Sequence, residues 1–220
     1  MQKELKYLEV NYSEKDLAYI DTLVKNLEIR CSKVVDWFDM KEFGPKTIVT
    51  LFPDIKSFHQ ALLECSPKMK VYDWTSGYTC KNSGNFIVDT LSLEGLHETS
   101  HKDATYDDYE NMLVHEFVHS CQLRIRNAPN VIWLTEGMAC YFANQYSSNQ
   151  RPVTTSLEEV FDNKNGQGKY SDYKKMFCYV YETYGRDYCL ELLTNREKAY
   201  LETPRLYEEA VNYYKETLKR

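Results

Sequence analysis

The spacing of two histidines constrains the fold of this chain more than any other feature. His115 and His119 stand four positions apart in the segment H-E-F-V-H, with Glu116 beside the first of them. Residues four apart on an α-helix lie on one face, so a helix here directs both imidazoles toward one point. Glu116 lies about 100° round the same helix, within reach of a water molecule at that point. The pattern predicts a helix that carries a metal site and a base.

A second segment offers the missing ligand. A catalytic zinc ion usually has three protein ligands and leaves a fourth position to water. Glu136 stands in the segment W-L-T-E-G, at the start of another apolar helix. A Glu-Gly pair in this setting seldom arises by chance. We therefore favour a zinc site of His115, His119 and Glu136 over two polar residues on the exposed face of a helix.

The chain contains the same short motif twice. The other match, H-E-T-S-H at positions 97–101, has polar residues at its variable positions, so a helix there would have no apolar face to bury. We expect a loop. Before positions 115–119, Thr105 and Asp108 form a candidate capping box, which predicts a helix from there to about Arg126.

The apolar residues of this predicted helix fall on one arc, opposite His115, Glu116 and His119, when they are placed at 100° steps. They are Leu113, Val114, Phe117, Val118, Cys121 and Ile125. We therefore expect a buried face and a separate chemical face.

Size and charge narrow the class of protein. A chain of 220 residues has ample length for one compact domain, 1–220. The net charge is −6 and the basic residues are scattered, which argues against nucleic acid and membrane surfaces as partners. No stretch approaches the ~20 apolar residues that cross a bilayer. The first residues lack the apolar run of a signal peptide, so we expect a cytoplasmic protein, unless a leader was trimmed. The oligomeric state stays open, and a monomer is compatible with the sequence.

The seven cysteines are irregularly spaced and include no C-x-x-C pair. This pattern predicts reduced thiols and not a disulfide framework.

The order of elements indicates an α+β fold. The sheet-bearing lobe, 1–104, is expected to begin with a long amphipathic helix that Ser13 caps, that includes Leu17 and that runs to about Met40. A strand at 47–52 and a helix from Asp54 to about Cys65 follow it. Two further strands lie around residues 81–84, the second of them at 85–90. A helical lobe, 105–220, carries the metal site and is interrupted at 128–130, 163–168, Gly185 and Pro204.

The two ligand segments resemble those of gluzincin metallopeptidases, in the aminopeptidase and collagenase branch of the thermolysin-like superfamily (peptidase MA). That branch has H-E-x-x-H, a spacer, and W-L-x-E-G-x-A-x-Y. The matching residues are His115, Glu116, His119, Trp133, Leu134, Glu136, Gly137, Ala139 and Tyr141. The resemblance covers about 105–147 closely and extends loosely to about 193. It implies a zincin-like fold, with the active-site helix between the two halves, and a zinc-dependent endopeptidase or small-peptide hydrolase that acts on extended peptide or protein substrates.

The resemblance also implies further roles. A tyrosine in a Y-x-K-G segment would donate to the oxyanion; the segment here is Y-K-K-M, which makes Tyr173 the expected donor and Tyr170 its alternative. An edge strand beside the metal helix would hold the substrate as an added strand, and Asn85–Thr90 is our candidate. Gly137 would let the two metal-bearing helices approach closely, as a glycine with only a packing role also would.

Two departures from the family pattern matter. The aminopeptidases' G-x-M-E-N segment has no acidic counterpart at residues 84–88, so aminopeptidase specificity is unsupported. Cys140 replaces an aspartate that helps to orient the ligands, so Asp107, Asp108 or Asn144 would have to do so. We disfavour Cys121 and Cys140 as soft ligands, because both fall on apolar helix faces.

Two other functions remain open. A zincin-like metal-binding or regulatory module would keep the metal and cleave nothing, but such a module needs no base, and Glu116 is present. A purely structural zinc site would need a closed coordination sphere, which three ligands do not provide.

Overall fold

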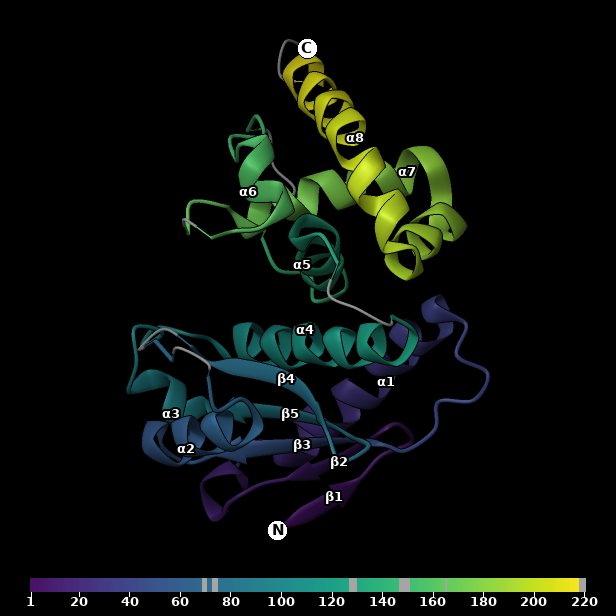
Figure 1. Ribbon diagram of the computed structural model, residues 1–220. Helices are drawn as coiled ribbons and strands as arrows, with labels where there is room; N and C mark the ends of the chain where they lie inside the picture. The colour runs from purple at the N-terminus through teal and green to yellow at the C-terminus, as the bar shows by residue number, and fades with distance from the viewer. Residues whose placement is uncertain (69–70, 73–74, 127–129, 147–150, 165, 218–220) are drawn as a thin grey trace. The chain divides into compact units, whose positions relative to one another are not determined.

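The computed structural model describes residues 1–68, 71–72, 75–126, 130–146, 151–164 and 166–217 (Figure 1). The chain divides into two compact units, Met1–Leu123 and Arg124–Arg220. The first contains the sheet and the second is helical, so the α+β class is confirmed. The boundary falls near the end of the helix that carries the histidines, and most of that helix belongs to the sheet-bearing unit.

The sheet of the first unit has the order β1-β2-β3-β5-β4 among the described residues. The strands are β1 (Gln2–Glu4), β2 (Leu8–Asn11), β3 (Thr47–Phe52), β4 (Gly77–Asn82) and β5 (Asn85–Leu91). β2, β3 and β5 are parallel, whereas β1 and β4 are antiparallel to their neighbours. The predictions of β3, β4 and β5 are confirmed. β1 and β2 were not predicted, because strands of three and four residues are too short for alternation to be recognised.

Helices cover both faces of this sheet. They are α1 (Ile20–Phe38), α2 (Ile55–Cys65), α3 (Leu93–His97) and α4 (Tyr106–Ile125). On β4, Thr79 bonds to α4, whereas the next residue, Cys80, is joined to α2. Successive side chains of a strand point to opposite faces, so α4 and α2 lie on opposite faces, as Figure 1 also shows.

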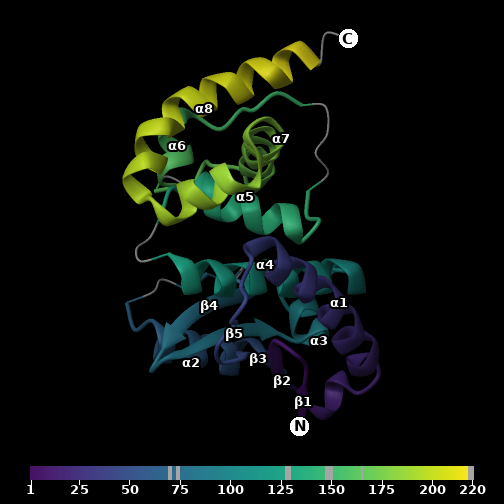
Figure 2. The same ribbon diagram turned by 90° about the vertical axis from the view of Figure 1, so that its right-hand side faces the viewer.

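α4 is capped at its start and is bonded to β3 and α1 further along the helix. Thr105 and Asp108 form the predicted capping box: the Asp108 amide donates to Thr105 Oγ1 (3.2 Å) and the Thr105 amide to Asp108 Oδ2 (3.0 Å). Within the helix, Ser120 Oγ lies 3.0 Å from Thr47 Oγ1 of β3, and Arg30 of α1 pairs with buried Glu110 at 2.8 Å. Figure 2 shows α1 beside α4. The helix is therefore fixed along its length.

The start of the first long helix was predicted too early. Ser13 caps a single 3-10 turn, Glu14–Asp16, with which it forms a capping box, and α1 begins only at Ile20. Asp16 accepts a short hydrogen bond from the Tyr19 hydroxyl, which holds the chain in this separate turn. Leu17, expected in the core, is 55% exposed because it follows the turn and precedes the helix.

The expected separation of a buried and a chemical face on α4 is wrong. His115 and Glu116 are buried too, with exposed fractions of 8% and 9%, although the apolar residues Leu113, Val114, Phe117, Val118 and Cys121 are buried more deeply. For Glu116 the reason is that its side chain lies against β4. The second motif forms a turn, as expected, except that its first histidine, His97, is the last residue of α3 and bonds to the Ala104 carbonyl.

The second unit consists of helices in the part that the structure describes. They are α5 (Ile132–Phe142), α6 (Leu157–Phe161), α7 (Tyr170–Thr194) and α8 (Arg196–Thr217). Gly185, with φ 81°, interrupts α7 as predicted. The predicted break at Pro204 is wrong: α8 continues through it, because buried Thr203, Leu206 and Ala210 keep this helix packed. The predicted break at 128–130 lies mostly outside the described residues. None of the described helices has the length and apolar character needed to cross a bilayer.

A disulfide corrects the prediction of fully reduced cysteines. Cys65, the last residue of α2, is bonded to Cys80 of β4. Spacing along the chain could not reveal this pair, because connectivity depends on which elements the fold brings together. Cys31, Cys121, Cys140, Cys178 and Cys189 are buried thiols.

A buried carboxylate holds the segment before α6 to α7. Asp172 Oδ2 accepts hydrogen bonds from the amides of Thr154 (2.7 Å) and Thr155 (2.9 Å), and Oδ1 accepts one from Lys175 (3.0 Å). Burial alone would raise the pKa of Asp172, but these hydrogen bonds outweigh burial and lower it. The ionised form of Asp172 therefore stabilises the second unit.

We predict that Asp172→Asn lowers the free energy of unfolding by about 3–5 kcal/mol, because it leaves the buried Lys175 charge without its partner. Urea unfolding at pH 7 measures this loss. Asp162→Asn is the matched control, since the Asp162–Lys164 pair is exposed and should contribute less than about 1 kcal/mol. Equal losses in the two variants would contradict the prediction.

Asp89 of β5 should give the stability of the protein a pH dependence opposite to that from Asp172. Burial, followed by the nearby Glu64 carboxylate, raises its pKa to about 6. Because the folded pKa lies above the unfolded value of about 3.9, its favourable contribution is complete below that value and is lost as the pH rises through about 6. We expect Asp89→Asn to improve stability by about 2 kcal/mol more at pH 8 than at pH 4. Urea unfolding at both pH values checks this, and an equal effect at both would contradict it.

Candidate metal centre

The two histidines of α4 converge as their spacing predicted. Their Nε2 atoms lie 3.0 Å apart, and the ring planes are steeply inclined to each other, at 78°. Two imidazole nitrogens at about 2.0–2.1 Å from one tetrahedral zinc ion stand about 3.3 Å apart. The pair is therefore close to the spacing of two ligands to a single ion.

Gln122 orients the second imidazole. Its Oε1 lies 2.9 Å from His119 Nδ1, and the Gln122 side chain is fully buried. An amide oxygen only accepts hydrogen bonds, so Nδ1 carries the proton and Nε2 keeps its lone pair for a metal. Metal-binding histidines are commonly held in this way.

The orienting residues expected from the sequence lie elsewhere. Asp107 and Asp108 are exposed at the start of α4, where Asp108 serves the capping box. Asn144 is exposed just after α5, with φ 54°. Gln122 was not identified from the sequence, because a residue one helical turn after a histidine is not part of a recognised motif.

Glu116 is held by the sheet. Thr79 Oγ1 donates to Glu116 Oε2 at 2.6 Å, and it also lies 2.9 Å from the Glu116 carbonyl oxygen. The Glu116 carboxylate is thus held in a fixed direction on the helix that carries both imidazoles. Thr79 was not identified from the sequence, because it meets Glu116 only through the packing of β4 on α4.

The carboxylate expected as third ligand belongs to α5. Glu136 is half-buried. Together with His115 and His119 it completes a group of residues that could hold a metal ion.

Arg126 and Tyr146 of the second unit interact electrostatically with Glu136. Burial lowers the pKa of Arg126, and the Glu136 charge opposes that shift. Burial contributes most to the raised pKa of the Tyr146 phenol, and the charges of Cys140 and Glu136 raise it further. Lys174, buried on α7, donates at 2.7 Å to the carbonyl oxygens of Gln145 and Tyr146, and burial lowers its pKa. Tyr146 and Lys174 carry no motif and were not identified from the sequence.

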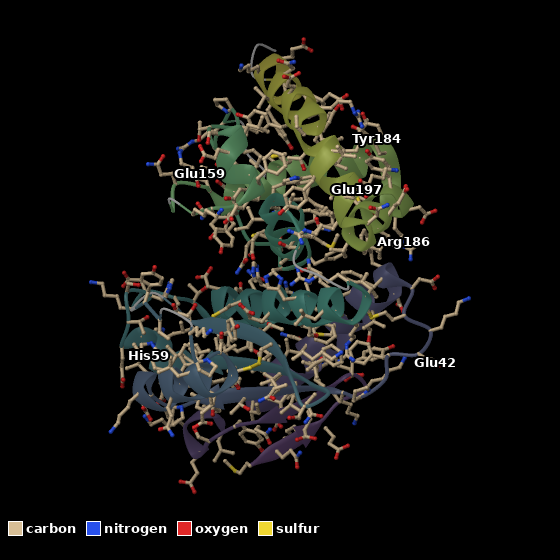
Figure 3. The ribbon with its side chains drawn as sticks, viewed as in Figure 1. Glu42, His59, Glu159, Tyr184, Arg186 and Glu197 are labelled. Carbon is tan, nitrogen blue, oxygen red and sulfur yellow. A yellow bond between two sulfur atoms is a disulfide. The ribbon has the colours of Figure 1, made fainter. Side chains whose placement is uncertain are left out.

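Tyr173 makes a contact that bears on its predicted role. Its side chain is fully buried, and its hydroxyl donates to the carbonyl oxygen of Glu159 at 2.9 Å; Glu159 is labelled on α6 in Figure 3. Burial, then the Glu159 charge, raise the pKa of Tyr173. A role as oxyanion donor therefore requires this hydrogen bond to break. Tyr170 is half-buried and lies against the rings of Tyr146 and Tyr173.

Gly137 has a packing role within the second unit. A Cβ atom built on it would overlap the backbone carbonyl of Tyr173 and stand 3.0 Å from Phe177 Cβ. The close approach that needs glycine is therefore between α5 and α7. Cys121 and Cys140 are fully buried, and burial raises the pKa of the Cys140 thiol, which disfavours the thiolate that a metal requires.

The prediction that β5 is the edge strand that receives the substrate is wrong. β5, which contains Asn85–Thr90, is paired on both sides, with β3 and with β4. β4 is the last strand of the sheet in the described part of the chain. β5 was the candidate because it lies shortly upstream of the metal helix in the sequence, but order along the chain does not reveal which strand forms the edge of the sheet.

Comparison of the chain with protein-family models and with curated proteins gave no match. The likeness to gluzincins therefore stays a prediction from the two ligand segments.

We predict that Gln122→Met, which keeps the volume and removes the acceptor, lowers zinc affinity by about 10- to 100-fold. Gln122→Glu keeps an acceptor and should bind zinc at least as well as Gln122→Met does. Gln60→Ala, on the exposed face of α2, serves as the control. Competition with a zinc-sensitive dye measures the affinities, and an unchanged affinity in Gln122→Met would contradict the role given to Gln122.

Proposed function

We propose that this protein is a zinc-dependent metallopeptidase, with His115, His119 and Glu136 as ligands and Glu116 as general base. The observation that carries the proposal is the convergence of the two Nε2 atoms beside a held carboxylate on one helix. Two imidazoles and one carboxylate are a ligand set typical of catalytic zinc. When bound, the ion supplies a Lewis acid that polarises a carbonyl and activates water.

The residues of the chain would divide the remaining work. Glu116 takes a proton from water as the water oxygen adds to the carbonyl carbon of the substrate. It returns that proton to the amide nitrogen as the carbon–nitrogen bond breaks, so one water is consumed and an acid and an amine leave. Gln122 keeps His119 in the tautomer that leaves Nε2 without a proton.

An extended peptide is the substrate class that this arrangement favours. β4 ends the sheet, and a strand at such a position can pair with an added chain through its backbone groups. The sequence lacks the acidic segment with which aminopeptidases bind a free amine. We therefore propose an endopeptidase or small-peptide hydrolase acting on peptides or proteins.

The test compares wild type with Glu116→Gln. We expect about one zinc ion per chain in both by elemental analysis, and loss of peptide-library cleavage by at least about 100-fold in the variant, because the ligands remain and the base does not. Glu98→Gln makes the same substitution in the other H-E-x-x-H segment and should keep both zinc and cleavage.

Other outcomes separate the alternatives. Zinc in both proteins with cleavage by neither would replace the peptidase with a metal-binding or regulatory module. Absence of zinc from wild type would contradict the proposal as a whole. Glu136→Gln should weaken zinc binding, and an affinity equal to that of wild type would remove Glu136 from the ligand set.

The cytoplasm remains the compartment that we propose, on the basis of the buried free thiols Cys31, Cys121, Cys140, Cys178 and Cys189. The Cys65–Cys80 disulfide argues for a more oxidising one. Alkylation of thiols in freshly lysed cells would decide, since a reduced pair in the cell supports the cytoplasm.

A further inference from the structure

Two residues of β4 lie directly against the Glu116 side chain. Thr79 donates to its carboxylate at 2.6 Å, and an added Cβ on Gly77 would stand 3.0 Å from its Cγ and Oε1. Gly77 and Thr79 are two positions apart, so both face α4. Together they form one wall of the space that Glu116 occupies.

Thr79 limits the rotation of Glu116. A glutamate side chain has several rotatable bonds, and a base is useful only when its carboxylate stays within a few tenths of an ångström of the reacting water. A hydroxyl that donates to a buried carboxylate gives a short, directional contact. Glu116 is 9% exposed, so water competes little for this bond.

Gly77 provides room for the same carboxylate. Its φ is not in the left-handed region, so its backbone conformation does not require glycine. A methyl group there would press on Glu116 Cγ and Oε1 at 3.0 Å and Cδ at 3.2 Å. The neighbour is a flexible side chain, which would move aside and lose the position that its hydrogen bond to Thr79 gives it.

β4 is itself firmly held. It pairs with β5 from Gly77 to Asn82, and the disulfide from Cys80 ties its other face to α2. The donor of Thr79 therefore sits on a fixed element, which positions a catalytic group better than a loop does.

We propose that β4 is the positioning element for the general base, with Thr79 as the donor that orients Glu116 and Gly77 as the residue that leaves space for it. This inference rests on the proposed peptidase function. It is distinct from any pairing of β4 with substrate, because it depends on side chains that face α4 and not on the backbone edge.

The matched variants are Thr79→Val, which removes the hydroxyl at nearly constant shape, and Thr79→Ser, which keeps it. We expect Thr79→Val to lower kcat by about 10- to 100-fold with KM within about 2-fold of wild type, and Thr79→Ser to recover most of kcat. Gly77→Ala should lower kcat similarly by displacing the same carboxylate. Thr22→Val makes the same substitution on the exposed face of α1 and should leave kcat unchanged.

A kcat of Thr79→Val equal to that of wild type would overturn the proposal. A kcat of Thr79→Ser as low as that of Thr79→Val would overturn it as well. Zinc content and unfolding midpoints, measured on each variant, identify a loss that comes from misfolding. A wild type that cleaves no peptide would contradict the proposed function alone. The positioning role is then decided by crystal structures of zinc-loaded wild type and Thr79→Val: we expect the Glu116 carboxylate to rotate away in the variant, and an unchanged position would overturn the inference.

Discussion

The packing of α4 on the sheet is the constraint on which the candidate centre depends. A helix alone brings His115 and His119 to one face, but it does not fix the tautomer of either ring or the direction of Glu116. The tautomer of His119 is set by Gln122, one turn further along α4, and the direction of Glu116 is set by Thr79 on β4. The polar contacts of α4 with β3 and α1 hold the helix in the register that these bonds need. The part of the centre that α4 carries is thus a property of the whole first unit.

Comparison of the two H-E-x-x-H segments shows that the motif alone does not determine the local structure. Both have the same histidine spacing, but only residues 115–119 lie within a long, capped helix that is packed on a sheet. At 97–101 the chain leaves a short helix and turns, and His97 bonds to a backbone carbonyl. The spacing brings two imidazoles together only where neighbouring residues sustain a helix, and apolar neighbours and a capping pair are visible in the sequence.

The sequence predicted features that depend on near neighbours. The range of β3, the cap and extent of α4 and the convergence of the histidines follow from local pattern. Features that depend on distant parts of the chain were missed or wrong: the Cys65–Cys80 bond, the interior place of β5 and the contact of Thr79 with Glu116. Pro204 shows the same limit, since local rules end a helix that tertiary packing continues.

Lys174 has a consequence for how the second unit can be followed experimentally. Its ammonium group is buried and donates to two carbonyl oxygens where the chain leaves α5, and burial lowers its pKa. Amine-modifying reagents reach such a group only when the surrounding helices separate. The acylation rate of this one lysine, read by mass spectrometry, is therefore a built-in reporter of opening around the helix that carries Glu136.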